Sequence, residues 1–212
     1  HLTALSCLTV LSVAPASAEV VLPAILGDGV VLKRDSVVPL WGSARPNEPV
    51  SIRVGWSEAA LTTVADATGR WRCDVPTGPA GGPYQVAVMD ADGPRVLQDV
   101  HLGEVWLCSG QSNMEWPLSS VLAAYQKSAA FDEALADGTS ARIKLFAVPR
   151  RVGLTPFTDV DATWRPCTPE NSADFSAVAY FFACALEARL GVAVGLVGSH
   201  WGGTPIEAWV SA

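Results

Sequence analysis

The second half of the chain alternates between two hydrophobic patterns, and this alternation constrains its fold more than any other feature. Short apolar runs of strand length alternate with longer runs whose apolar residues recur at helical spacing. Strands joined by helices in this way form a parallel sheet with right-handed crossovers. The range 149–174 contains four prolines and is predicted to be a long loop. In order, we predict a strand at 103–108, a helix at 121–135, a strand at 143–148, a helix at 175–190 that ends at Gly191, and a strand at 192–197.

A polar turn follows the first of these strands. Residues 107–116 are Leu-Cys-Ser-Gly-Gln-Ser-Asn-Met-Glu-Trp, which places Ser112 between a strand and a segment that can be helical. Such a turn exposes a hydroxyl above the sheet edge and directs nearby backbone N–H groups to the same point. Met114 stands where the G-x-S-x-G motif has its second glycine, so the turn is a different serine-hydrolase signature. The simpler alternative is a helix N-cap, since Ser and Asn both cap well.

A glycine-rich turn follows the last predicted strand. Residues 198–209 are Gly-Ser-His-Trp-Gly-Gly-Thr-Pro-Ile-Glu-Ala-Trp. The carboxyl ends of parallel strands meet at one edge of a sheet, so we expect Gly202 and Gly203 to lie beside Ser112. Glycine N–H groups are free of side-chain obstruction, and Pro205 suits the first turn of a following helix. A tight connection and a phosphate-binding turn are the alternatives, although no Gly-Lys-Ser/Thr follows the glycines.

Residues 19–101 carry a different pattern. Short β-prone runs are separated by turns rich in Gly, Pro, Asn and Asp, and 50–54 alternates apolar and polar residues like a strand with one buried face. Regularly spaced short strands predict a β-sandwich, here an accessory domain. The segment contains no convergent set of polar residues that would carry chemistry. We therefore expect it to be structural or to contact carbohydrate.

Composition and charge narrow the class of protein. Half of the 212 residues are hydrophobic and 17% are charged, which allows a sizeable core and argues against disorder. The net charge of −7 disfavours nucleic acid or an anionic membrane as a partner. No metal and no cofactor is expected, because the sequence has neither a zinc-type Cys/His spacing nor an H-E-x-x-H run. No segment after residue 20 is long and apolar enough to span a bilayer.

The first 18 residues are similar to a partial signal peptide. Residues 2–13 form an uncharged apolar run, and Ala16-Ser17-Ala18 is a small-residue cleavage site. We therefore expect an exported protein, periplasmic or secreted. A buried N-terminal strand or helix is the alternative, and a lipoprotein signal fits less well. Export permits disulfides among the remaining cysteines, and their pairing stays open.

The turn around Ser112 strongly resembles the nucleophile block of the sialate O-acetylesterase family, within the SGNH hydrolases. The similarity extends over 99–118, and a helix at 175–183 and a second block at 201–209 resemble the same family in the same order. The resemblance implies a β-sandwich followed by an α/β/α hydrolase domain with a parallel sheet, of which 102–212 is the N-terminal part. It also implies removal of an O-acetyl group from a sugar or glycan, typically the 9-O-acetyl of sialic acid.

The same resemblance assigns the site residues. Ser112 is the nucleophile, which forms an acetyl-enzyme. The N–H groups of Ser112 and Gly203 are oxyanion donors. Gly202, Gln111 and Asn113 complete the oxyanion and substrate-binding set.

Two later blocks of the family have no match in this sequence. One carries an Asn donor, and the other carries an Asp-x-x-His that supplies the base. We therefore interpret the chain as an N-terminal fragment with an unpaired sheet edge, close to inactive alone, because losing the triad costs on the order of 10⁶ in turnover. His200 is a candidate base, although a loop side chain that faces solvent or substrate is the favoured interpretation. His101 precedes the first predicted strand and should lie far from Ser112.

Three other functions remain as alternatives. An acetyl xylan esterase-like glycan deacetylase would share Ser112 and differ in its glycan. A non-catalytic carbohydrate-binding protein would bind through residues 19–101. A lipase-like SGNH hydrolase would act on longer acyl chains.

Overall fold

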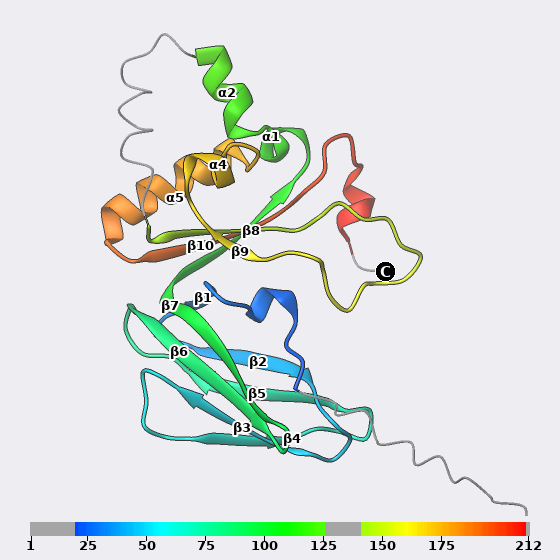
Figure 1. Cartoon of the computed structure of the whole chain (residues 1–212). Helices are drawn as coiled ribbons and strands as arrows, with labels where there is room; N and C mark the ends of the chain where they lie inside the picture. Colours follow the sequence, from blue (N-terminus) through cyan, green and yellow to red (C-terminus); the bar gives the residue numbers. More distant parts are fainter. Residues whose placement is uncertain (1–19, 126–140, 211–212) are drawn as a thin grey trace, which may run out of the picture.

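The computed structural model describes residues 20–125 and 141–210, so the predicted signal segment lies outside the described residues. The first part of the described chain is built almost entirely from strands, and the second part adds helices (Figure 1). A long strand, β7, runs from the first part into the second. The elements of the first part are η1 (Ala24–Leu26, a 3-10 helix), β1 (Val31–Lys33), β2 (Val37–Ser43), β3 (Pro49–Val54), β4 (Leu61–Val64), β5 (Arg70–Pro76), β6 (Gly81–Asp90) and β7 (Gly93–Gly110).

The second part contains the strands and helices that the hydrophobic pattern predicts, with two additions. The predicted strands at 143–148 and 192–197 and the helix at 175–190 are confirmed as β8, β10 and α5. The predicted loop at 149–174 is wrong in two places, because it contains β9 and α4. The predicted helix at 121–135 begins earlier and is described only as far as Tyr125. The elements are α1 (Ser112–Glu115), α2 (Leu118–Tyr125), β8 (Ile143–Ala147), β9 (Trp164–Pro166), α4 (Pro169–Ser172), α5 (Ala177–Leu190), β10 (Ala193–His200) and η2 (Ile206–Trp209).

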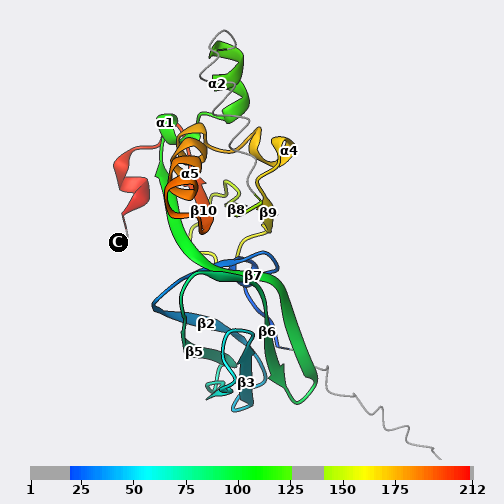
Figure 2. The ribbon, with the colours of Figure 1, turned by 90° about the vertical axis from the view of Figure 1, so that its left-hand side faces the viewer.

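One mixed sheet of eight strands runs through both parts. Its first-part members β4, β3, β6 and β7 pair antiparallel, whereas the end of β7 pairs in parallel with β10, and β10 with β8. The predicted parallel arrangement is therefore confirmed for β7, β10 and β8, and β9 adds an antiparallel edge. A separate β-sandwich at 19–101 is not confirmed, because β7 belongs to both parts (Figure 2). Among the described strands, β2 and β5 form a second, two-stranded sheet.

Side chains of β8 and β10 alternate between two hydrophobic cores. Leu145 and Leu196 pack with helix α5 on one face of the sheet. Phe146 and Val197 point to the other face and join the core of the first part, together with Trp164 of β9. The α/β/α prediction put a second helical layer on this face. In the part of the chain that the structure describes, the strand-rich first part covers it in places instead.

Helix α5 is well defined at both ends, and its inward side is small or apolar. The Ser176 hydroxyl accepts a hydrogen bond from the Ala179 N–H at 3.2 Å, which caps the first turn. Gly191 ends the helix in the left-handed region at φ 64°, as the sequence predicts. Tyr180 and Ala183 are buried against the sheet. The helix therefore sits close to the parallel strands and covers one of their faces.

The second half of β7 has a free edge within the described residues. β6 and β1 end opposite Leu102 and Gly103, and from there on β7 pairs with β10 alone, so one of its two edges is unpaired. Trp106 is 43% exposed and Leu107 is 69% exposed along this stretch. The predicted unpaired edge is thus present in the described part of the chain.

Gly103 lies where β7 changes partners, and we expect Gly103→Ala to destabilise the fold. A Cβ there would overlap the backbone oxygen of Ala193 on β10, which cannot move without disturbing the ladder. Overpacking of this kind costs about 1–3 kcal/mol. Urea unfolding should show that loss, whereas Gly78→Ala, where a Cβ has nothing within 4 Å, should stay close to wild type. Equal midpoints for the two variants would contradict the prediction.

Candidate active site

Ser112 lies at a strand-to-helix turn, as predicted. β7 ends at Gly110, whose φ of 143° few other residues adopt, and α1 begins at Ser112. The Ser112 side chain is exposed, and its hydroxyl donates a hydrogen bond to Gln111 Oε1 at 3.0 Å. Gln111 therefore orients the serine hydroxyl, while the Asn113 side chain is exposed beside it. The turn lines a shallow depression of about 450 Å³, which residues 109–114 form.

 

The glycine-rich loop after β10 is docked onto this turn. β10 runs parallel to β7 with His200 opposite Gly110, so both strands end at the same edge of the sheet. The Trp201 N–H donates to the Gly110 carbonyl at 3.0 Å, and the Gly202 N–H donates to Glu115 Oε2 at 2.6 Å. These two hydrogen bonds reach the residues on either side of Ser112. The predicted meeting of the serine turn and the glycine loop is therefore confirmed.

The two glycines of the loop differ in what surrounds them. A Cβ on Gly202 would overlap Glu115 Oε2 and would lie 3.7 Å from the Ser112 Cα. Gly203 has a φ of 76° and open space where a Cβ would stand. The Gly202 N–H already has a carboxylate acceptor, so the N–H groups of Ser112 and Gly203 remain the candidate oxyanion donors.

The α-helix predicted to follow the second block is not present in the described residues. The loop leads instead into η2, a 3-10 helix of four residues, with Pro205 at its N-cap. Such a short helix has little dipole to offer a developing negative charge. Electrostatic stabilisation at this edge therefore depends on individual N–H groups and side chains.

The serine turn is also held from the side of helix α5. The Ala177 N–H donates to the Trp116 carbonyl and the Leu118 N–H donates to the Phe175 carbonyl, both at 2.9 Å. Leu118 is buried in the core that α5 forms with the sheet. The segment after Ser112 is thus fixed to the start of α5, which makes the turn part of the rigid scaffold.

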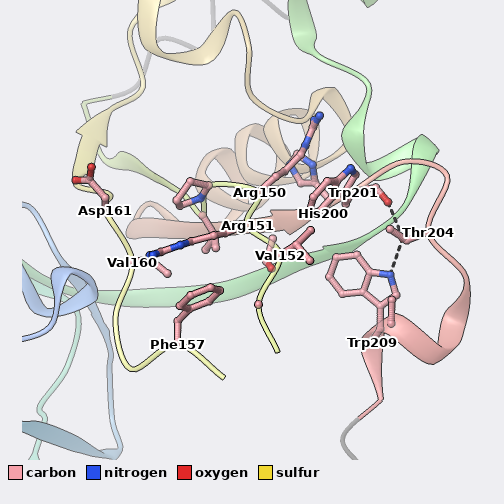
Figure 3. A pocket seen from close by; sticks show the side chains of 15 residues that line it. Arg150, Arg151, Val152, Phe157, Val160, Asp161, His200, Trp201, Thr204 and Trp209 are labelled. Carbon is pink, nitrogen blue, oxygen red and sulfur yellow. Dashed lines mark hydrogen bonds between the residues drawn. The ribbon is translucent and has the colours of Figure 1, made fainter. Parts of the chain in front are cut away.

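A pocket of about 820 Å³ opens between the ends of β8 and β10 (Figure 3). Arg150 and Arg151 come from the segment after β8, and His200 and Trp201 come from the end of β10 and the glycine loop. The volume is in the range of sites that hold small ligands. The full lining is Val148, Pro149, Arg150, Arg151, Val152, Gly153, Phe157, Val160, Asp161, Ser199, His200, Trp201, Thr204, Ala208 and Trp209.

Aromatic and cationic side chains line this pocket. The Arg151 guanidinium lies 4.0 Å from the centre of the Phe157 ring, a cation–π contact. The Thr204 hydroxyl donates to the Trp201 carbonyl at 2.6 Å and accepts from Trp209 Nε1 at 2.8 Å (Figure 3). Thr204 thereby ties η2 back to the glycine loop and holds an aromatic wall in place. The pocket suits a ligand with both apolar faces and negatively charged or hydroxyl groups.

His200 lines the pocket and is not bonded to Ser112. Its Nδ1 is buried and has no hydrogen-bond partner within the described residues. Burial, followed by the positive charge of Arg150, lowers the pKa of His200, while Glu115 opposes the shift. The interpretation of His200 as a loop residue is wrong, because it is the last residue of β10, but its side chain does line the pocket. His101 lies nine positions before Gly110 on β7, about 30 Å away along an extended strand, as expected.

Sequence reasoning missed Glu115 and Arg150 as members of the site. Glu115 is one helical turn after Ser112, and Arg150 follows the strand next to β10. The rule that strand ends share one edge points to Arg150, but it does not say which side chain of the segment turns inward. The Arg150 guanidinium forms an ion pair with Glu115, which also accepts the Gly202 N–H, so the segments after β7, β8 and β10 meet at this carboxylate.

Cysteines and metal-type clusters do not add to the site in the described chain. Cys108, on the strand before the turn, is buried, and burial raises the pKa of its thiol. In residues 20–125 and 141–210, no group of three or more His, Cys, Asp or Glu side chains is placed to hold a metal ion. Within the same residues, no helix has the length and apolar character needed to cross a membrane.

The chain is similar in sequence to known proteins over most of its length. Sialate O-acetylesterase from Mus musculus is 30% identical over 199 residues, which cover 86% of this chain and 36% of the mouse protein. The Homo sapiens protein of the same name is 28% identical over 200 residues, 88% of this chain and 38% of its own length. No family model matches the sequence.

A solved structure points in the same direction. The crystal structure of a carbohydrate acetylesterase from Xanthomonas citri matches with a TM-score of 0.80 and 39% sequence identity, over 91% of this chain and 43% of that chain. The chain is a relative of the sialate O-acetylesterases. It spans between about a third and two fifths of the length of the curated relatives it matches.

We expect His200 to be neutral at pH 7, because burial and Arg150 both disfavour its protonation. An NMR titration of the ring protons should give a pKa below about 6.5, the ordinary value for histidine. Arg150→Met should raise this pKa, since a nearby positive charge is lost. A wild-type pKa at or above the ordinary value would contradict the structure.

The same shift has a consequence for stability. Below about pH 6.5 the unfolded chain binds a proton at His200 that the folded chain does not bind, so the contribution of His200 to stability falls. The loss begins as the pH drops through the unfolded pKa and is complete below the lowered folded pKa. Urea midpoints of wild type and His200→Gln, compared between pH 7.5 and 5, should show a smaller decline in the variant.

Proposed function

We propose that the protein containing this chain is a carbohydrate O-acetylesterase that uses Ser112 as its nucleophile. The observation that carries the proposal is the docking of the glycine loop onto the Ser112 turn, through Trp201 on Gly110 and Gly202 on Glu115. Nucleophilic ester hydrolysis needs a hydroxyl and backbone donors held together at one point. The names of the related proteins supply the reaction class, ester hydrolysis on an acetylated sugar.

The proposed reaction has two steps. Ser112 Oγ attacks the acetyl carbonyl while a base accepts its proton, and the carbonyl oxygen becomes an oxyanion that the N–H groups of Ser112 and Gly203 stabilise. Collapse expels the sugar oxygen, which takes the proton from the base, and leaves an acetyl group on Ser112. Water, deprotonated by the same base, then attacks the acetyl-enzyme and releases acetate and the free serine.

The base in this reaction is proposed from the family resemblance. The family pattern supplies it from an Asp-x-x-His that has no match in residues 1–212, and the geometry around His200 does not replace it, since Ser112 donates to Gln111 instead. Each oxyanion donor is worth about 3 kcal/mol in the transition state. Turnover in the proposed reaction therefore depends both on that base and on the nucleophile and oxyanion donors of this chain.

The pocket beside the turn supports an anionic sugar, and we propose an O-acetylated sialic acid as the substrate. A sialic acid carries a carboxylate, hydroxyls and apolar sugar faces. The Arg151 guanidinium makes no salt bridge to a carboxylate of the described residues and is held over Phe157 in the pocket wall. Arginine is well suited to bind a carboxylate with two parallel hydrogen bonds. An acetylated neutral glycan such as xylan is the alternative, and export to the periplasm or the medium suits either substrate.

Replacing the nucleophile is the direct test of the proposed chemistry. In the full gene product that contains this chain, we expect Ser112→Ala to lower acetate release from O-acetylsialate by about 10⁶-fold, as loss of a serine nucleophile does elsewhere. An active-site phosphonate should label wild type at Ser112 and leave the variant unlabelled. Activity that falls steeply from acetyl to butyryl esters would exclude a lipase-like enzyme. Undiminished turnover in Ser112→Ala would overturn the proposal.

The preference for an anionic sugar is tested by changing Arg151. Loss of a carboxylate partner costs about 1.5–3 kcal/mol, so Arg151→Met should lower kcat/KM for O-acetylsialate by about 10- to 100-fold. Acetylated xylo-oligosaccharides, which carry no carboxylate, should be hydrolysed at the wild-type rate. An equal decrease for both substrates would assign Arg151 a structural role, and the sialate preference would then be withdrawn.

A further inference from the structure

We propose that Glu115 is a positioning residue that fixes the glycine loop against the nucleophile turn, with Arg150 as its counter-charge. Glu115 is the last residue of α1, and its side chain is 22% exposed. Oε2 accepts the Gly202 N–H at 2.6 Å, and Oε1 pairs with the Arg150 guanidinium. One carboxylate thus contacts the segments that follow β7, β8 and β10.

The contact with Gly202 is a strong one. A hydrogen bond from a backbone N–H to a charged carboxylate is shorter and about twice as strong as a neutral one, and 2.6 Å is at the short end for N–H to oxygen. The carboxylate occupies the place where a side chain at 202 would begin, so this position accepts only glycine without displacing Glu115. The Trp201 N–H binds the Gly110 carbonyl on the other side of Ser112. The loop is therefore attached at two points that flank the nucleophile.

This attachment determines which N–H groups remain for the substrate. The Gly202 N–H is directed to Glu115, which leaves the next peptide, that of Gly203, for the oxyanion. A displacement of about 1 Å at such a donor costs on the order of 100-fold in rate. The effect of Glu115 on catalysis rests on the proposed esterase function, but its contact with Gly202 does not.

Arg150 is needed because a bare carboxylate would oppose the reaction. Negative charge builds up on the substrate oxygen in the transition state, and a like charge nearby raises the energy of that state. The Arg150 guanidinium cancels the charge of Glu115 and leaves the hydrogen bond to Gly202 in place. The pair therefore offers an acceptor to the loop without a net negative charge beside the oxyanion.

The test is a double-mutant cycle on the full gene product, with acetate release as the readout. We expect Glu115→Ala to lower kcat by about 100-fold, with KM changed by no more than about three-fold. Glu115→Gln keeps an oxygen for Gly202 and should lose less. Arg150→Met alone leaves an uncompensated carboxylate, and adding Glu115→Gln should restore part of its kcat. Glu58→Ala, an exposed acid in the turn after β3, is the control and should match wild type.

The outcomes separate positioning from a general effect on folding. The proposal is overturned if Glu115→Ala keeps kcat within about three-fold of wild type, or if the losses of Arg150→Met and Glu115→Gln simply add. The Gly202 amide gives a second readout that needs no activity: its NMR signal should lie downfield and exchange slowly in wild type and should lose both properties in Glu115→Ala. If wild type releases no acetate but the amide behaves as expected, the esterase function fails and the Glu115 contact stands.

Discussion

The parallel pairing of β7 with β10 is the contact on which the rest of the site depends. It aligns His200 with Gly110, so the turn that carries Ser112 and the loop that carries Gly202 leave the sheet side by side. The register is fixed by burial, because successive side chains of β10 enter different cores. A shift of one residue would exchange Leu196 and Val197 between the α5 side and the side of the first part. The hydrophobic cores thus set the geometry of the active-site edge.

β7 connects the two parts of the chain, because it pairs with strands of both. Its first half pairs antiparallel with β6 and its second half in parallel with β10. A charged cluster stands near the change of partners: Lys144 and His101 bind the Asp99 carboxylate at 2.7 and 2.9 Å. Burial would raise the pKa of Asp99, but the hydrogen bonds from Lys144 and His101 lower it. The contact of Lys144 with Asp99 joins β8 to β7 at this point and so connects the two parts of the chain.

The sequence predicts the frame of the site better than its side-chain contacts. Hydrophobic periodicity and Gly191 locate α5, β8 and β10, and the strand-end rule brings Ser112 and Gly202 together. The same periodicity does not predict β9 and α4, because their residues lie in a proline-rich segment whose composition is typical of a loop. It does not predict the ion pair of Glu115 with Arg150 either. That contact depends on the order of three strands in the sheet and on the rotamers of two long side chains. Local pattern determines elements, whereas contacts between distant elements depend on tertiary geometry.

The charges of Glu115 and Arg150 balance each other at this edge. Arg150 lies between Glu115, whose charge it balances, and His200, whose protonation it disfavours. If His200 were protonated, two cations would compete for one carboxylate, and the Gly202 N–H would lose part of its acceptor. A neutral imidazole avoids that competition and leaves Oε2 of Glu115 to the loop. Burial is the main cause of the lowered pKa of His200, and the guanidinium that balances Glu115 lowers it further, so Arg150 also protects the contact of Glu115 with the glycine loop.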